Sequence, residues 1–164
     1  MSSLEAQAMR LTSPNSGLAS DYLNHFNEVL RAIENLPLLL PDMIDELTAW
    51  KPVSYRAYFE QSNLPGSADT IAMYDSLDDD FRREVEAMIK LLDAIIVESI
   101  SIIMSYRGPD GVIKPEDVEK ICAKLASVLR MVIEKMVDLV NYGYASPLEA
   151  PQDMADRILD AAYL

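Results

Sequence analysis

The sequence predicts an all-α fold: a helical bundle built on an antiparallel pair of long helices at about residues 78–107 and 115–142. Shorter N-terminal helices and one C-terminal helix are expected to pack around this pair. Apolar residues recur at three- and four-residue steps along both stretches, which is the spacing of one face of an α-helix. The short connection between them is rich in glycine and proline, and long helices with short loops favour antiparallel neighbours.

The chain is long enough for one domain with a hydrophobic core, because it has 164 residues, of which 50% are hydrophobic. We expect residues 1–17 to be a flexible N-terminal tail, since they lack the basic and apolar regions of a targeting peptide. Residues 18–164 are expected to form a single all-α domain.

The first helix is predicted to begin at Ser20 or Asp21, either of which can cap it. It should end near Asn35, because Pro37 disfavours helical geometry in the residue before it. Its apolar stripe consists of Tyr22, Phe26, Val29 and Ile33. The connector that follows, residues 36–41, is apolar, and its leucines need cover.

Three shorter helices are predicted before the long pair. One begins at Pro41, which suits the first position of a helix, and closes at Pro52. The next is capped by Ser54, and another begins at Ser67.

The first long helix has clear start signals, because Ser76 or Asp78 can cap it and Asp79 and Asp80 complement the helix dipole. Between Leu91 and Tyr106, apolar residues cover most of the helix circumference. We therefore expect this helix to be central and packed on several sides.

The second long helix follows a predicted turn at Asp110 and Gly111. Pro115 suits its first position, and Gly143 is predicted to be its left-handed C-terminal cap. A last amphipathic helix is expected to carry an apolar stripe: Met154, Ile158, Leu159 and Ala162.

The charge balance excludes several classes of partner. Lys and Arg number 14 against 27 Asp and Glu, and the net charge of −13 repels phosphate backbones and anionic lipids. The densest apolar run is shorter than the roughly 18 residues of a membrane span. We therefore expect no nucleic-acid partner and no membrane insertion.

Cys122 is the only cysteine, so the chain forms no internal disulfide and no thiolate zinc site. It lies on the apolar stripe of the second long helix, near Ile121 and Leu125, where a thiol behaves as a small hydrophobe. A reducing, cytoplasmic location is expected.

The connection between the long helices partly resembles the calcium-binding loop of an EF-hand. Four residues stand where that loop has its fifth, sixth, eighth and twelfth residues: Asp110, Gly111, Ile113 and Asp117. However, Tyr106 and Gly108 occupy the first and third positions, which need oxygen ligands. We therefore expect no metal site here.

His25 is the only histidine, and we expect it at the partly exposed edge of the first helix's apolar stripe. A helical bundle with one rim histidine and an acidic surface resembles histidine phosphotransfer domains, which relay phosphate between response regulators. That resemblance would make His25 the phosphoacceptor. Those domains place a basic and a small residue soon after the histidine, whereas here Glu28, one turn on, would repel a phosphoryl group.

An aromatic cluster within ten residues is the candidate partner-binding surface: Trp50, Tyr55, Tyr58 and Phe59. Aromatic residues are enriched where proteins recognise one another. The same residues would also serve to pack short helices onto the long pair, and we prefer this second interpretation.

No catalytic motif is present: the chain has neither G-x-S-x-G nor a phosphate-cradling glycine loop, and we expect no cofactor. The leading hypothesis is a non-enzymatic interaction or regulatory module that self-associates through apolar helix faces, as a homo-oligomer such as a homodimer. The alternative is a phosphotransfer-like signalling domain using His25. A pocket for an apolar ligand, lined by methionines and aromatics, is a third and less favoured hypothesis.

Overall fold

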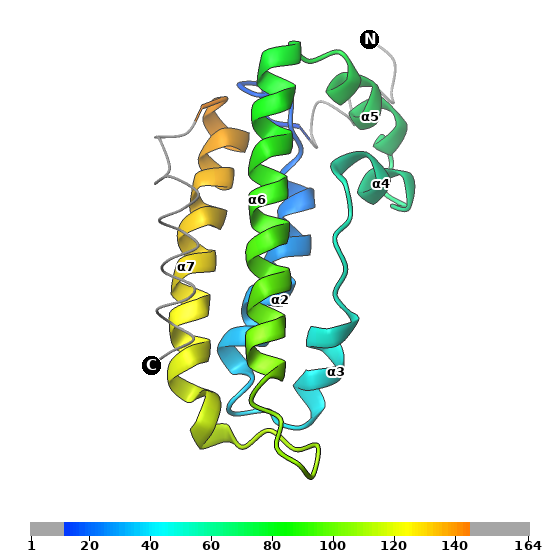
Figure 1. The fold of residues 1–164 in the computed structure, drawn as a ribbon. Helices are drawn as coiled ribbons and strands as arrows, with labels where there is room; N and C mark the ends of the chain where they lie inside the picture. Colours follow the sequence, from blue (N-terminus) through cyan, green and yellow to red (C-terminus); the bar gives the residue numbers. More distant parts are fainter. Residues whose placement is uncertain (1–11, 145–164) are drawn as a thin grey trace. The chain divides into compact units, whose positions relative to one another are not determined.

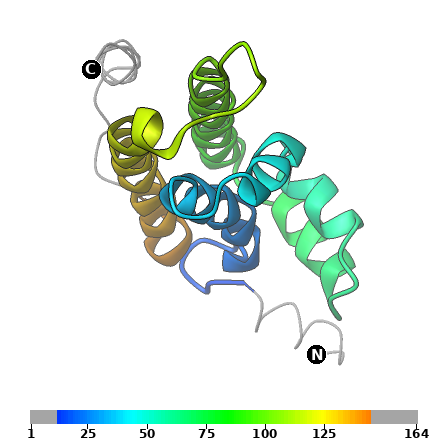
Figure 2. The same cartoon turned by 90° about the horizontal axis from the view of Figure 1, so that it is seen from below.

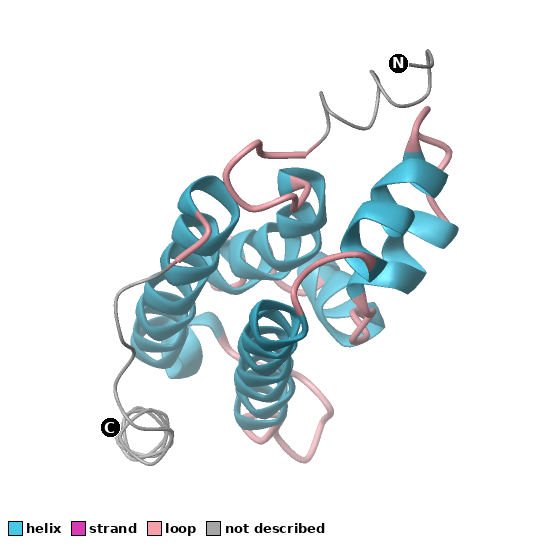
Figure 3. Ribbon diagram, turned by 90° about the horizontal axis from the view of Figure 1, so that it is seen from above, coloured by secondary structure: helices cyan, strands magenta, loops and turns pink. Residues whose placement is uncertain are grey.

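The computed structural model describes residues 12–144, and within this range every regular element is a helix (Figures 1 and 3). A 3-10 turn precedes six α-helices: η1 (Ser20–Leu23), α2 (Asn24–Asn35), α3 (Asp42–Ala49), α4 (Tyr55–Glu60), α5 (Ser67–Asp75), α6 (Asp79–Met104) and α7 (Pro115–Tyr142). The predicted all-α class is confirmed. The predicted C-terminal helix, with Met154 and Ile158, lies outside the described residues.

Several predicted helix starts are explained by their caps. The Ser54 hydroxyl accepts a hydrogen bond from the Ala57 N–H at 3.1 Å and caps α4. Before α6, the Asp78 carboxylate accepts from the N–H groups of the next residues, at 3.2 Å from Asp80 and 3.3 Å from Phe81. These bonds satisfy amides that have no partner inside the first turn.

The first long helix ends earlier than predicted. Beyond Met104, the N–H groups of Tyr106 and Arg107 bond to the carbonyls three residues before them, so the chain tightens and leaves the α-helix. The connection from α6 to α7, residues 105–114, can be followed in Figure 2. The second long helix has the predicted bounds, Pro115–Tyr142.

Contacts divide the described chain into two compact units. Unit 1 combines residues 12–25, 52–90 and 134–144, and unit 2 combines residues 26–51 and 91–133. Both long helices contribute residues to both units. The single domain at residues 18–164 stays a prediction.

Four aromatic rings pack together in unit 1, where α4 contacts α5 and η1: Tyr22, Tyr55, Phe59 and Tyr74. The ring of Tyr55 lies 5.3 Å from that of Tyr22, 4.9 Å from Phe59 and 4.5 Å from Tyr74, measured between centroids. Tyr22 donates its hydroxyl hydrogen to the Val53 carbonyl at 2.5 Å. The Tyr55 oxygen accepts from the Ala19 N–H at 2.9 Å, so large apolar areas are buried with their polar ends paired.

Part of the predicted flexible tail, residues 12–17, lies within the described range. The Asn15 side chain donates to the Asn141 carbonyl at 2.9 Å, and the Ser16 hydroxyl donates to the Val140 carbonyl at 2.5 Å. Gly143 follows with φ 78°, and a Cβ there would meet the Asn15 oxygen at 2.8 Å. These bonds hold residues 13–16 against the end of α7.

The core of unit 2 is aliphatic and comes mainly from α2, α6 and α7. Its fully buried side chains include Ile33, Leu92, Ile96, Ile103, Leu125 and Leu129. The helix α6 is not covered all round here, because Val97 is 51% exposed. On another side of α6, Ser99 is buried, and its hydroxyl donates to the Ile95 carbonyl at 2.6 Å.

We predict that Tyr55→Phe lowers the free energy of unfolding by about 1–3 kcal/mol, because the buried Ala19 N–H loses its acceptor. Urea unfolding of the full chain measures this change. Tyr142→Phe, on an exposed ring, is the matched control and should leave the unfolding midpoint unchanged. Equal midpoints for both variants would contradict the proposed role of the Tyr55 hydroxyl.

Candidate groove on unit 2

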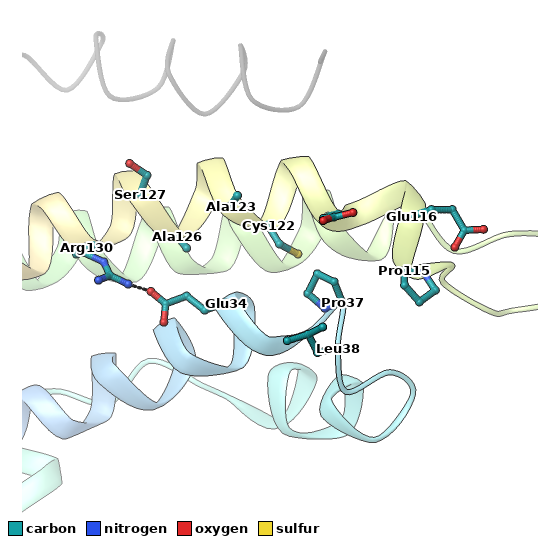
Figure 4. A pocket seen from close by; sticks show the side chains of 11 residues that line it. Glu34, Pro37, Leu38, Pro115, Glu116, Cys122, Ala123, Ala126, Ser127 and Arg130 are labelled. Carbon is teal, nitrogen blue, oxygen red and sulfur yellow. Dashed lines mark ion pairs between the residues drawn. The ribbon is translucent and has the colours of Figure 1, made fainter.

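Unit 2 contains a groove of about 820 Å³ between the end of α2, the following connector and one face of α7 (Figure 4). Its mainly apolar lining includes Pro37, Leu38, Cys122, Ala123, Ala126 and Ser127. The α7 residues recur at three- and four-residue steps, so they share one helix face. This face was not predictable from the sequence, because small residues give only a weak apolar signal.

Small side chains shape the α7 wall of the groove. Cys122 and Ala126 are buried, whereas Ala123 and Ser127 on the same face are exposed. The distance between packed helices depends on the side chains at their contact. This wall therefore allows a close approach by a further helix.

The charges at the groove are mainly negative. Arg130 forms an ion pair with Glu34 from the end of α2, drawn as a dashed line in Figure 4. Both side chains are partly exposed, so the pair contributes little to stability. Glu116 and Glu119 also line the groove. With Glu34, the lining contains three carboxylates and one guanidinium.

The apolar connector at the groove edge is not covered by the described chain. Leu38 is 82% exposed and Leu39 is 48% exposed, although Leu36 is fully buried. The apolar sequence of this connector predicted that its leucines need cover. Exposed leucines beside an apolar groove are typical of a binding surface.

Cys122 is a buried thiol, as predicted. Its side chain is 1% exposed, and burial raises its pKa to about 12. Because the thiolate is the reactive form, this cysteine is unreactive at neutral pH. It contributes packing rather than chemistry.

His25 is buried in unit 1, at 8% exposure, and the expected partly exposed position is wrong. Its ring stacks on that of Tyr22, 6.0 Å away, and burial lowers its pKa. A phosphoacceptor must enter the active site of another protein, so this burial gives the phosphotransfer hypothesis no support.

The four predicted partner-binding aromatics have different environments. Tyr55 and Phe59 are buried in unit 1, and Tyr58 donates to the Asp21 carboxylate at 2.9 Å. These contacts support the packing interpretation. Trp50 belongs to unit 2, where it is half-buried and lines a second cavity of about 670 Å³ together with Met43.

The EF-hand-like connection is organised by its own backbone and side chains. The Asp110 carboxylate accepts from the Val112 N–H at 3.1 Å, and Gly111 has φ 78°. This arrangement is a turn that needs no ion. Within residues 12–144, no three His, Cys, Asp or Glu side chains gather as a metal site would require.

Asp93 is a partly buried titratable group, and its burial was not predictable from the sequence. It lies on α6 in unit 2, half-buried, and its Oδ1 is buried without a hydrogen-bond partner in the described chain. Desolvation raises its pKa from 3.8 to about 6.

Comparison with known protein families, curated proteins and solved structures finds no match for this chain. Among residues 12–144, no helix combines the length and the apolar character that crossing a membrane requires. The function must therefore be inferred from the surfaces themselves.

We predict that Asp93→Asn stabilises the protein at neutral pH by about 1 kcal/mol, a value reduced because the carboxyl group is partly exposed. Well below pH 3.8, Asp93 is protonated in both the folded and the unfolded chain, so its burial carries no desolvation penalty for a charge. As pH rises, the unfolded chain ionises first, and the penalty is complete above about 6.

Urea unfolding across this pH range measures the effect. The difference between variant and wild type should grow from acid to neutral pH. Glu98→Gln, an exposed change on the same helix, is the matched control and should show no such trend. Parallel pH profiles for Asp93→Asn and wild type would contradict the prediction.

Proposed function

We propose that this chain is a non-enzymatic helical interaction module that self-associates through the apolar surface of unit 2. This surface consists of the groove and the exposed side chains of Leu38 and Leu39 at its edge. The observation that carries the proposal is the 82% exposure of Leu38 beside a groove of about 820 Å³. Burying one such leucine contributes about 1.5–3 kcal/mol toward association.

The groove favours a helix as the bound element. Its α7 wall is one helix face with small residues at Ala123 and Ser127, and helices bind apolar grooves through apolar residues spaced three and four apart. A second copy of the chain can supply such a helix. The apolar-ligand hypothesis has less support at this groove, because its lining includes no methionine or aromatic residue. The second cavity has Met43 and Trp50, but three charged side chains also line it: Glu28, Arg31 and Glu46.

We further propose that α6 and α7 form the antiparallel pair on which the bundle is built. The end of α6 and the start of α7 belong to the same compact unit, and residues 105–114 connect them. Both helices bury aliphatic side chains in this unit, including Ile96 and Leu125. An antiparallel pair would allow these faces to cover each other.

Sedimentation equilibrium over a range of concentrations tests self-association. The wild type should associate, and Leu38→Asp with Leu39→Asp should weaken association by about tenfold or more, because two apolar contacts are replaced by like charges. Leu64→Asp is the matched control, since this exposed leucine belongs to unit 1, and it should associate as the wild type does.

A wild-type chain that sediments as a monomer at every concentration would overturn the proposal. Equal weakening by Leu64→Asp would also argue against it, because the effect would then reflect added charge and not the unit 2 surface.

A further inference from the structure

We propose that the groove of unit 2 binds the C-terminal segment of its own chain, residues 148–164, which a competing helix must displace. The inference rests on the proposed function in one respect only, because it treats the groove as a helix-binding surface. The segment is the one stretch outside the described residues for which the sequence predicts an amphipathic helix.

The length of chain after α7 permits this return. From Arg130, at the near end of the groove, to Tyr142 is about 18 Å along the helix. Residues 145–151 can span about 23 Å when extended, so they reach back to the groove. The following residues, 152–164, form about 18 Å if helical, and the α7 wall from Pro115 to Arg130 measures about 22 Å.

The side-chain pattern of the segment matches the groove. Met154, Ile158 and Ala162 are spaced four residues apart, and Leu159 lies beside them on the same face. Large apolar side chains on this face would meet the small residues of the α7 wall, which leave room for them. Burial of the stripe would also cover part of an apolar surface that the described chain leaves open.

The charges are compatible with this arrangement. Asp153, Asp156 and Asp160 lie on the side of the predicted helix opposite Ile158, so they point away from the groove carboxylates when the stripe faces inward. Lys120 and Lys124 are exposed on α7 and form no ion pair within residues 12–144. Their long side chains are within one turn of the small-residue wall and attract the segment's negative charge.

Thiol labelling of the full-length chain tests the proposal. In a Cys122→Ala background, Ser127→Cys places a thiol on the exposed groove wall, and Ser101→Cys places a matched thiol on the exposed side of α6. Both substitutions are nearly isosteric. We expect N-ethylmaleimide to label Ser127→Cys about tenfold or more slowly than Ser101→Cys, because the segment covers it.

Changes confined to the segment complete the test. Ile158→Asp with Leu159→Asp should raise the Ser127→Cys rate to that of Ser101→Cys, whereas Asp153→Asn, on the polar side, should leave it slow. A synthetic peptide of residues 148–164 should restore slow labelling to the Asp-substituted chain. If Ser127→Cys and Ser101→Cys are labelled at equal rates in the chain whose C-terminal segment is unchanged, the proposal is overturned.

Dilution separates binding within one chain from exchange between copies. Protection of Ser127→Cys that persists at the lowest measurable concentration supports binding within the chain, because that process is independent of concentration. Loss of this thiol protection on dilution would overturn binding within the chain. A protected thiol in a strictly monomeric protein would overturn self-association and leave this inference standing, so the two proposals fail separately.

Discussion

Each long helix must bury one apolar face, and the rest of the structure depends on that requirement. Isolated helices are marginal in water, and most of their stability in proteins comes from packing. Along α7, Leu125, Leu129 and Val132 are fully buried, whereas the face beside the groove has small and charged residues and no large apolar side chain. Packing against these apolar faces therefore holds the neighbouring elements in place. The groove face of α7 stays accessible where no part of the described chain packs on it.

Burial also shifts the pKa values of several ionisable groups inside the protein. Desolvation lowers the pKa of His25 and raises the pKa values of Asp93, Cys122 and Tyr55. In every case the neutral form is favoured. Burial is the first cause of each of these four shifts.

Much of the helical organisation was predictable from local chemistry, because caps and apolar spacing act within a few residues. The start of α7 at Pro115 and the cap at Ser54 are examples. The burial of His25 was not, since the Tyr22 ring beside it packs in turn against Tyr55 and Tyr58, which lie far along the chain. The groove was also missed: alanines and a serine give no pattern until the end of α2 lies opposite them. The uncovered connector at Leu38 was the one part of the site that the sequence indicated.

The hydrogen bonds from residues 13–16 to the end of α7 limit when unit 1 can fold during synthesis of the chain. Ser13 and Asn15 reach a carbonyl of Asn141 over sequence separations of 128 and 126 residues. A chain leaving the ribosome can form α4 and α5 early, because their contacts are local. Unit 1, however, contains stretches from both ends of the described chain, so it cannot close until Gly143 has emerged. Its early residues must wait without these partners while almost the whole described chain is made.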